Sequence, residues 1–507
     1  MKITPRFFII LTALGLSSCA VNPVTGQSQL ALVSERSEYD QGDKTIRAVL
    51  KEVGEYQDAG LQNYLNDLGT KLVKVTERAD KPFNFYVADG GEVNALATPG
   101  HIVFFRGLLP YLNSEAELMS VLGHEVGHIT ARHSVRQQTT GILTQIGLIA
   151  LQAAVGTQTQ SQAAVDLTGQ LGGAIASVGF ASYGRGMELE ADRLGARYMA
   201  ASGYNPAEAK DVFYTFTRLR ELQEKITTSA GLPAPTVGFE RVLSTHPADE
   251  QRIAQLLQEV GATAPDTNQG RARLLAQLDG LAFGPGPKEG IRTRSTFYAP
   301  QTQAKITFPA NFTLALSPGA GFAAFDPTTQ ARVQLIAAEM PHDFKLTDAL
   351  ADLASGLGRV EAFTTQGGYP AITGVKTYTE RGQSRQLRAF VLQDKATKTG
   401  FDGVPTNKRA MFAGVFSVPT EHFAAQDGLF WQAWHSFRRL TPAQAKAVQP
   451  LRLRVVTVKA GDTVEKLAAR LPTGSFQTEW FRLLNGLEPT ATLKPGQQVK
   501  VFVDPNG

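Results

Sequence analysis

The sequence has little cysteine, little net charge and no long apolar run, and each shortage excludes a class of protein. Cys19 is the only cysteine in 507 residues, so no intrachain disulfide can form, and stability must come from apolar cores, a metal or partners. The formal net charge is +4 and no Lys/Arg-rich run is present, which argues against a nucleic-acid partner. Residues 141–181 are apolar and glycine-rich, but neither half reaches the roughly 18 uninterrupted apolar residues of a membrane span.

Residues 1–19 predict export. A basic start, an apolar stretch from Phe7 to Leu16 and small residues before Cys19 are typical of a secretory signal peptide, and the stretch is too short to span a membrane. Leu16-Ser17-Ser18-Cys19 also resembles a bacterial lipobox. That resemblance implies a lipidated Cys19, a membrane anchor and, in bacteria with two membranes, sorting to the outer membrane with the protein facing the periplasm. The alternative is an ordinary signal peptide with an incidental cysteine.

The pattern His124-Glu125-Val126-Gly127-His128 is the H-E-x-x-H motif, whose meaning depends on a helical setting. Ser114 followed by Glu117 predicts a capping box at a helix start. An apolar stripe at helical spacing follows, formed by Leu118, Val121, Leu122, Val126 and Ile129. On a helix His124 and His128 project from one side and can bind one zinc ion, while Glu125 can reach a water on it. Two histidines on a partly buried helix are the plain alternative.

A second helical stretch, residues 187–196, supplies a carboxylate. Glu188 and Asp192 lie one turn apart on one face. Hydrolytic zinc sites commonly use two histidines and one carboxylate and keep a position for water. Glu188 can therefore be the third ligand, and Asp192 can hold a ligand imidazole by its other N–H. Glu190 points elsewhere and is expected at the surface, and His133 is expected to be structural.

Helical residues 35–80 precede two predicted strands, 83–87 and 101–105. A strand beside a metal site can pair its free edge with an extended peptide substrate. An ordinary buried strand is the alternative.

Three stretches together resemble one protease family. His124–His128, Glu188–Asp192 about sixty residues later, and Ser244–Ile253 are similar to the HtpX-like zinc metalloproteases, which include the CAAX prenyl endoproteases, and most of all to the soluble, exported BepA-like branch. The resemblance covers roughly residues 30–260 and implies a gluzincin fold, mainly α with a small β-sheet. It implies one zinc ion per chain on His124, His128 and Glu188, with Glu125 as general base.

The same resemblance suggests substrate-binding residues. The stretch from Asn94 to Ile102 corresponds to the family's segment before the zinc helix, which makes Asn94, Ala95 and His101 candidates. His101 stands where the family usually has a glycine, and its bulk could narrow the substrate edge.

The expected chemistry is hydrolysis of a peptide bond by zinc-activated water, with Glu125 taking the proton and passing it to the leaving amine. Arg252 and His246 are both candidates to stabilise the oxyanion. His246 precedes Pro247, so it lies near a helix start. From there it could also reach the zinc and close the site, as the matching histidine is thought to do in the BepA-like branch, or it could simply cap or lie at the surface.

The remaining chain predicts a multidomain protein. After the signal peptide we expect a metalloprotease domain at 20–265, a linker at 266–296 after a short helix near 270–279, an α+β domain of unknown role at 297–445, and a small module at 452–504. Residues 141–181 predict either packed helices or a mobile lid over the zinc cleft.

The last module resembles LysM over about fifty residues, with Lys459-Ala460-Gly461-Asp462-Thr463 near its start and Leu493-Lys494-Pro495-Gly496 near its end. The resemblance implies a strand, two helices and a strand, and binding to peptidoglycan glycan; the alternative is a fold kept for protein contacts. No 34-residue repeat is visible, so a link to outer-membrane assembly machinery rests on resemblance only.

The leading hypothesis is a lipid-anchored periplasmic zinc metalloendopeptidase that cleaves misfolded or stalled envelope polypeptides. The rival is a non-cleaving chaperone or wall-binding adaptor with a closed zinc site, although such a binder does not need Glu125. A wall-modifying hydrolase is a third option, suggested only by the tail.

Overall fold

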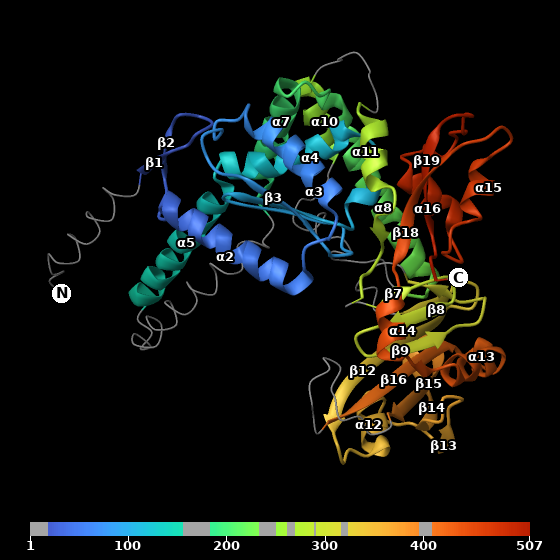
Figure 1. Cartoon of the computed structure of the whole chain (residues 1–507). Helices are drawn as coiled ribbons and strands as arrows, with labels where there is room; N and C mark the ends of the chain where they lie inside the picture. The colour runs from blue at the N-terminus through green and yellow to red at the C-terminus, as the bar shows by residue number, and fades with distance from the viewer. Residues whose placement is uncertain are drawn as a thin grey trace. The chain divides into compact units, whose positions relative to one another are not determined.

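The structure, a computed structural model, describes residues 19–155, 183–232, 250–260, 269–287, 290–315, 323–394 and 408–506. The chain divides into two compact units (Figure 1). Unit 1 comprises Met1–Asp89, Val93–Phe216 and Glu240–Gln277, and unit 2 comprises Gly90–Glu92, Thr217–Phe239 and Leu278–Gly507. Most of the predicted signal peptide lies outside the described residues, and Cys19 begins the first strand.

Unit 1 is mainly helical. Its elements are β1 (Cys19–Val21), β2 (Ser28–Leu30), α2 (Glu35–Val53), α3 (Ala59–Val73), β3 (Asn84–Ala88), β4 (Ala95–Thr98), β5 (His101–Phe105), η1 (Leu109–Tyr111), α4 (Glu115–Thr130), α5 (His133–Val155), α7 (Arg185–Ala201), η3 (Pro206–Glu208), α10 (Glu250–Val260) and α11 (Arg271–Leu278, with Leu278 in unit 2). Helix α8 (Ala209–Ser229) begins in unit 1 and continues into unit 2. The predicted helical stretch 35–80 is interrupted at Gly54, whose φ of 87° suits a residue without a Cβ.

The sheet of unit 1 has the order β3-β5-β4. Strand β5 is buried along its whole length, pairing in parallel with β3 and antiparallel with β4. The strand predicted at 101–105 is therefore the central strand, and it has no free edge. Among the described residues the two edge strands of this sheet are β3, which corresponds to the strand predicted at 83–87, and β4, which the sequence did not predict.

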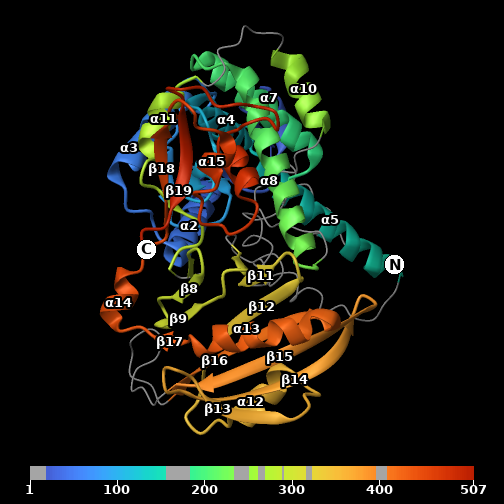
Figure 2. The ribbon, with the colours of Figure 1, turned by 90° about the vertical axis from the view of Figure 1, so that its right-hand side faces the viewer.

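Unit 2 is built on a seven-stranded antiparallel sheet. Its order is β10 (Thr313–Leu314), β11 (Ala324–Asp326), β12 (Ala331–Pro341), β16 (Lys408–Pro419), β15 (Gln383–Gln393), β14 (Pro370–Glu380) and β13 (Val360–Thr364). Because side chains alternate along a strand, Phe390 packs with Trp434 of α13 (Phe423–His435), while Val391 packs on the other face with Leu350 of α12 (Leu346–Leu353). Figure 2 shows α13 lying across the sheet.

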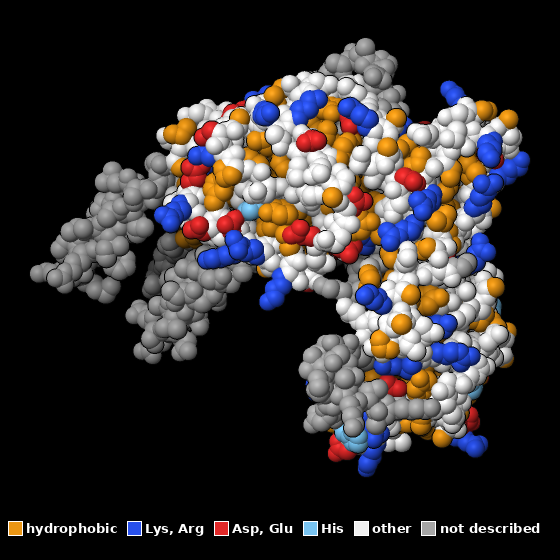
Figure 3. Space-filling model, viewed as in Figure 1, with side chains coloured by type: hydrophobic (Ala, Val, Ile, Leu, Met, Phe, Trp, Pro, Cys, Tyr) orange, Lys and Arg blue, Asp and Glu red, His pale blue; other side chains and the backbone are white. Residues whose placement is uncertain are grey.

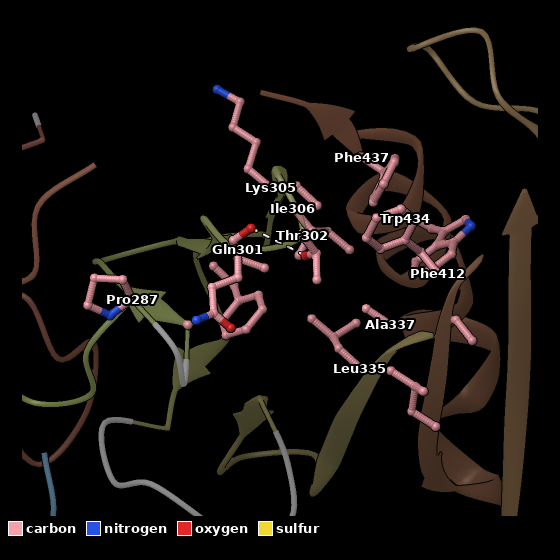
Figure 4. Close-up of a pocket in the computed structure, with 16 residues that line it drawn as sticks. Pro287, Gln301, Thr302, Lys305, Ile306, Leu335, Ala337, Phe412, Trp434 and Phe437 are labelled. Carbon is pink, nitrogen blue, oxygen red and sulfur yellow. Dashed lines mark hydrogen bonds between the residues drawn. The ribbon is translucent and has the colours of Figure 1, made fainter. Parts of the chain in front are cut away.

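A second sheet in unit 2 has the order β17 (Arg438–Arg439), β9 (Ala304–Thr307), β8 (Thr296–Ala299) and β7 (Ile291–Arg292). A cavity of about 190 Å³ opens where this sheet meets the larger one. Its lining is mostly apolar, with Leu335, Phe412 and Trp434 around it, and the Lys305 side chain points away from it (Figure 4). The two sheets therefore do not fill the space between them.

The C-terminal module has the predicted order of strand, two helices and strand. These are β18 (Leu451–Thr457), α15 (Val464–Ala468), α16 (Gln477–Leu484) and β19 (Gln498–Val503), and the short helix α14 (Pro442–Ala447) precedes them. The described residues of the expected linker 266–296 form helix and strand. They include α11 and β7, and also β6 (Ala282–Phe283), which pairs with β18, with Phe283 stacked on Phe502 at 4.3 Å between ring centroids.

Within the described residues, none of the helices combines the length and the apolar character that a membrane span requires. The face of the molecule in Figure 3 shows basic and acidic side chains interspersed, in keeping with the small net charge.

Candidate metal centre

Helix α4 carries the H-E-x-x-H motif and begins as its sequence predicts. The Ser114 hydroxyl accepts a hydrogen bond from the Glu117 N–H at 3.0 Å. In a capping box the Glu117 carboxylate would accept a second hydrogen bond from the N–H of Ser114. It accepts instead from the N–H of the preceding residue, Asn113, at 2.8 Å. Nearly every residue of α4 is buried, including Glu125 and His128. The motif therefore lies on a helix that packs on all sides.

Helices α4 and α7 cross almost backbone to backbone, because small residues face each other there. A Cβ on Gly123 would lie 3.0 Å from the Cα of Gly195, and one on Gly127 would lie 3.0 Å from the carbonyl oxygen of Ala191. Glycine on both sides permits this approach. The crossing brings Glu188 of α7 opposite the two histidines of α4, and the glycines are the sequence signal that could have predicted it.

Three predicted ligands converge at this crossing. The candidate ligand atoms of His124, His128 and Glu188 all lie within 4.8 Å of one another. The two Nε2 atoms are 3.0 Å apart, and each lies 3.5 Å from an oxygen of Glu188. A tetrahedral zinc ion with Zn–N bonds of about 2.0–2.1 Å holds its ligand atoms about 3.3 Å apart. The spacing of these three groups therefore fits zinc.

His124 is oriented by a carboxylate. Its Nδ1 lies 2.9 Å from Asp192 Oδ1, and Arg252 of α10 donates two hydrogen bonds of 2.7 Å to Asp192 from Nε and Nη2. Burial alone would raise the pKa of Asp192, but the hydrogen bonds from Arg252 and His124 outweigh it and hold that pKa at about 2. The ionised Asp192 can only accept, so His124 Nδ1 carries the proton and Nε2 faces the ligand cluster.

His128 is oriented differently, by a histidine. Its Nδ1 lies 2.7 Å from Nδ1 of His133, the first residue of α5. His133 Nε2 in turn lies 3.2 Å from Glu190 Oε2, to which Arg136 donates at 2.6 Å. The ring of Tyr183 stacks on His128 with 4.2 Å between centroids.

These contacts revise the expectation for Glu190 and specify what His133, expected to be structural, contacts. Glu190 was expected at the surface, but only 15% of its side chain is exposed. The hydrogen bond from His133 holds the pKa of Glu190 low, at about 2, and Arg136 contributes in the same direction. Burial lowers the pKa of His133, which keeps this imidazole neutral at neutral pH. On a continuous helix His133 would lie off the ligand face; it reaches His128 because α4 ends at Thr130 and α5 begins at His133.

Glu125 lines a cavity that it shares with one of the three candidate ligands, His124. The cavity, of about 60 Å³, is also lined by Asp192, Arg252 and apolar side chains of α8 that include Phe213. A buried carboxylate beside a metal-binding imidazole is suitably placed for proton transfer.

Arg252 was predicted as an oxyanion donor, but its guanidinium faces carboxylates. Besides its bonds to Asp192, Nη1 lies 3.0 Å from Glu188 Oε2. The group is buried and its plane stands over the ring of Phe213, 5.0 Å from the centroid. This geometry assigns it to holding Asp192 and Glu188 in place.

The other candidate residues lie apart from the ligand cluster or outside the described chain. His246 lies outside the described residues. Asn94 and Ala95 are buried; Ala95 begins β4, one of the two edge strands, and Asn94 directly precedes it. His101 is buried on β5, where its Nε2 lies 2.6 Å from Asp43 of α2. This contact fixes the imidazole against α2, and β5 is the central strand, so His101 does not project from the sheet edge.

Comparison with known proteins agrees with this geometry. Residues 60–260 match the family model described as Peptidase family M48, and residues 456–502 match the LysM domain. The beta-barrel assembly-enhancing protease of Escherichia coli (strain K12) is 32% identical over 238 residues, which are 46% of this chain and 45% of that protein. The mitochondrial metalloendopeptidase OMA1 of Schizosaccharomyces pombe is 27% identical over 241 residues, which are 46% of this chain and 64% of that protein.

The match to the first of these relatives spans less than half of its length. Among solved structures, the match to LpqN, involved in cell envelope biogenesis of Mycobacterium tuberculosis, covers 27% of this chain and 83% of the LpqN chain. Its TM-score is 0.22 at 10% sequence identity, which is too weak to assign a fold. The family models, the match to the protease and the ligand cluster at 124, 128 and 188 agree with one another. Residues 60–260 of this chain are therefore a peptidase family M48 domain, and residues 456–502 are a LysM domain.

Proposed function

We propose that the chain is a zinc-dependent metalloendopeptidase. The observation that supports this best is the convergence of His124, His128 and Glu188 at zinc-ligand spacing beside a cavity that Glu125 also lines. Metalloendopeptidases among the similar proteins support the same class of reaction.

A bound zinc ion would supply Lewis acidity, polarising the scissile carbonyl and a water molecule. Every other part of the chemistry belongs to side chains of this chain. Glu125 accepts the proton of the attacking water and returns it to the leaving amine. Asp192 and Arg252 keep His124 and Glu188 in the ligand geometry. Apolar residues of α8 line the cavity beside Glu125, which limits competing water.

The finer proposal concerns place and substrate. The sequence of residues 1–19 favours export and a lipid anchor on Cys19, hence a periplasm-facing protein at the outer membrane. The name of the E. coli relative, a beta-barrel assembly-enhancing protease, supports misfolded or stalled envelope polypeptides as substrates. The LysM domain supports attachment to peptidoglycan.

A second candidate is a non-cleaving adaptor in which His246 closes the zinc site. The position of His246 within the Ser244–Ile253 stretch is the only feature that favours it. The presence of Glu125 argues against it, because a protein that binds without cleaving does not need a general base.

The test compares zinc content and casein cleavage in the full chain, Glu125→Gln, His246→Ala and the control Glu221→Gln, an exposed glutamate of α8. We expect about one zinc per chain in all four, and cleavage about 10²–10⁴-fold slower in Glu125→Gln but unchanged in Glu221→Gln. Faster cleavage by His246→Ala than by the wild type would show that His246 inhibits the site. Absence of zinc from every protein would refute the central assignment, and zinc without any cleavage, even in His246→Ala, would favour the adaptor.

A further inference from the structure

A row of hydrogen-bonding side chains leads away from the ligand cluster behind His128. It runs from His128 to His133, then to Glu190 and Arg136, with separations of 2.7, 3.2 and 2.6 Å. Exposure rises along the row, from 0% for the side chain of His133 to 15% for Glu190 and 33% for Arg136. His133 therefore contacts no solvent, and the outer members connect it to the surface.

The chemistry of these groups fixes where the protons lie. An ionised carboxylate only accepts, so His133 Nε2 must carry a proton to bond Glu190. A neutral imidazole has one N–H, which leaves Nδ1 of His133 as an acceptor. The 2.7 Å contact between the two Nδ1 atoms then requires that His128 Nδ1 carries its proton. His128 Nε2, which faces Glu188, is left with its lone pair.

We propose that the pair His133 and Glu190, anchored by Arg136, is a positioning relay that fixes the tautomer of His128, so that Nε2 faces the metal. The proposal rests on the proposed function, because it assigns these residues to the same zinc site. Asp192 does the equivalent for His124 in a single step, so each ligand histidine has its own orienting group.

The backbone between α4 and α5 is built to bring His133 to this place. Only Ala131 and Arg132 separate the helices, and Arg132 has a φ of 56°, in the left-handed region that a non-glycine residue adopts at a cost. The strained turn is held by the buried ion pair of Arg132 with Glu38 of α2. Without that turn α4 would continue as a helix and carry residue 133 off the ligand face.

The first experiment locates the proton of His128 in the zinc-free full chain, using ¹⁵N-labelled histidine and two-bond ¹⁵N–¹H correlation NMR. We expect His128 to be protonated on Nδ1 in the wild type. We expect a mixture of tautomers in Glu190→Ala. Protonation of wild-type His128 on Nε2 would overturn the relay, and this measurement needs no variant to fold and no zinc to bind.

The second experiment measures zinc affinity by competition with a chromophoric chelator. We expect His133→Phe and Glu190→Ala each to weaken binding about 10–100-fold, and Glu190→Gln, which keeps an acceptor, to lose less. Because the two residues act in series, the double variant should lose no more than His133→Phe alone. His101→Asn is the matched control, since it also removes the contact of a buried imidazole with a carboxylate, the half-exposed Asp43, from unit 1 but leaves the ligands untouched.

The outcomes are distinct. Additive losses in the double variant, or losses no larger than in His101→Asn, would show that His133 and Glu190 only support the fold. A wild-type chain that binds no zinc would refute the proposed function, and the tautomer measurement would still decide the relay.

Discussion

A methyl group added at Gly195 should open the crossing of α4 and α7 and disturb the metal centre. An alanine Cβ there would lie 2.9 Å from the backbone N of His124 and 3.0 Å from the carbonyl carbon of Gly123. Both atoms belong to the backbone of α4, so no rotamer change can relieve the contact. Gly186, on the same helix, has nothing within 4 Å of its Cβ position, which makes Gly186→Ala the matched control.

The size of the effect follows from these distances. Carbon atoms pack comfortably at about 3.5–4.0 Å, so the helices must separate by roughly 0.5–1 Å. Overpacking of this kind costs about 1–3 kcal/mol of unfolding free energy, whereas Gly186→Ala should be neutral or stabilise α7 by up to about 1 kcal/mol. Metal and catalytic sites tolerate misplacement of only about 0.5 Å. Glu188 moves with α7, so Gly195→Ala should also weaken zinc binding.

Urea unfolding of the zinc-free proteins measures the first effect, and chelator competition measures the second. Gly195→Ala should lower both stability and zinc affinity, while Gly186→Ala should lower neither. If the two variants behave alike in both assays, the close backbone approach of α4 and α7 does not set the ligand geometry.

Four further outcomes follow from the structure. Arg252→Met removes the cation that contacts both buried carboxylates, Asp192 and Glu188, and leaves Asp192 its contact with His124, so urea unfolding should show a loss of about 3–5 kcal/mol. Asp192 and Glu190 have pKa values of about 2 in the folded chain, against about 4 when unfolded. The two ionised carboxylates therefore stabilise the folded chain fully above about pH 4, and this contribution is lost as the pH falls toward about 2. The melting temperature should fall over the same pH range, and it should fall less steeply in Glu190→Gln, which has one of the two carboxylates fewer. Arg132→Gly relieves about 1–3 kcal/mol of backbone strain but leaves Glu38 buried and unpaired, so calorimetry should show net destabilisation. Chelation should end cleavage and lower the melting temperature, and added zinc at about 100 times its Kd should restore about 2.7 kcal/mol.

The sequence predicted the elements that have a strong local signal. The strands predicted at 83–87 and 101–105 and the helix predicted near 270–279 appear as β3, β5 and α11, with ends no more than one residue from those expected. The LysM order of strand, two helices and strand was also correct. Apolar periodicity and capping residues are local properties, so one chain suffices to detect them.

Elements that depend on distant partners were missed. Strand β4 has only four residues beside Pro99-Gly100, and its pairing with β5 defines it. The pairing of β6 with β18 joins residues about 170 positions apart, so a Gly-Pro-rich stretch that looked like a linker became the edge of a sheet. Non-local pairing leaves little trace in the local sequence.

The relay behind His128 was missed for a different reason. Spacing on one continuous helix places His133 off the ligand face, and only the left-handed turn at Arg132 brings it back. No residue preference marks such a turn when the residue is arginine instead of glycine. Glu190 was assigned to the surface because its neighbours Glu188 and Asp192 share the opposite face of α7; its partners lie on α5, which the sequence alone does not place.

The two orienting arrangements attach the metal centre to different helices. Asp192 lies on the same helix as Glu188, and Arg252 of α10 contacts both carboxylates. A displacement of α10 would therefore disturb His124 and Glu188 together. The orienting group of His128 is instead the first residue of α5, so a displacement of the first turn of α5 would release one ligand and leave the other two held. Loss of Arg252 and loss of Arg136 should consequently have different effects. Without Arg252 of α10, both His124 and Glu188 are held less firmly. Without Arg136 of α5, only His128 is held less firmly.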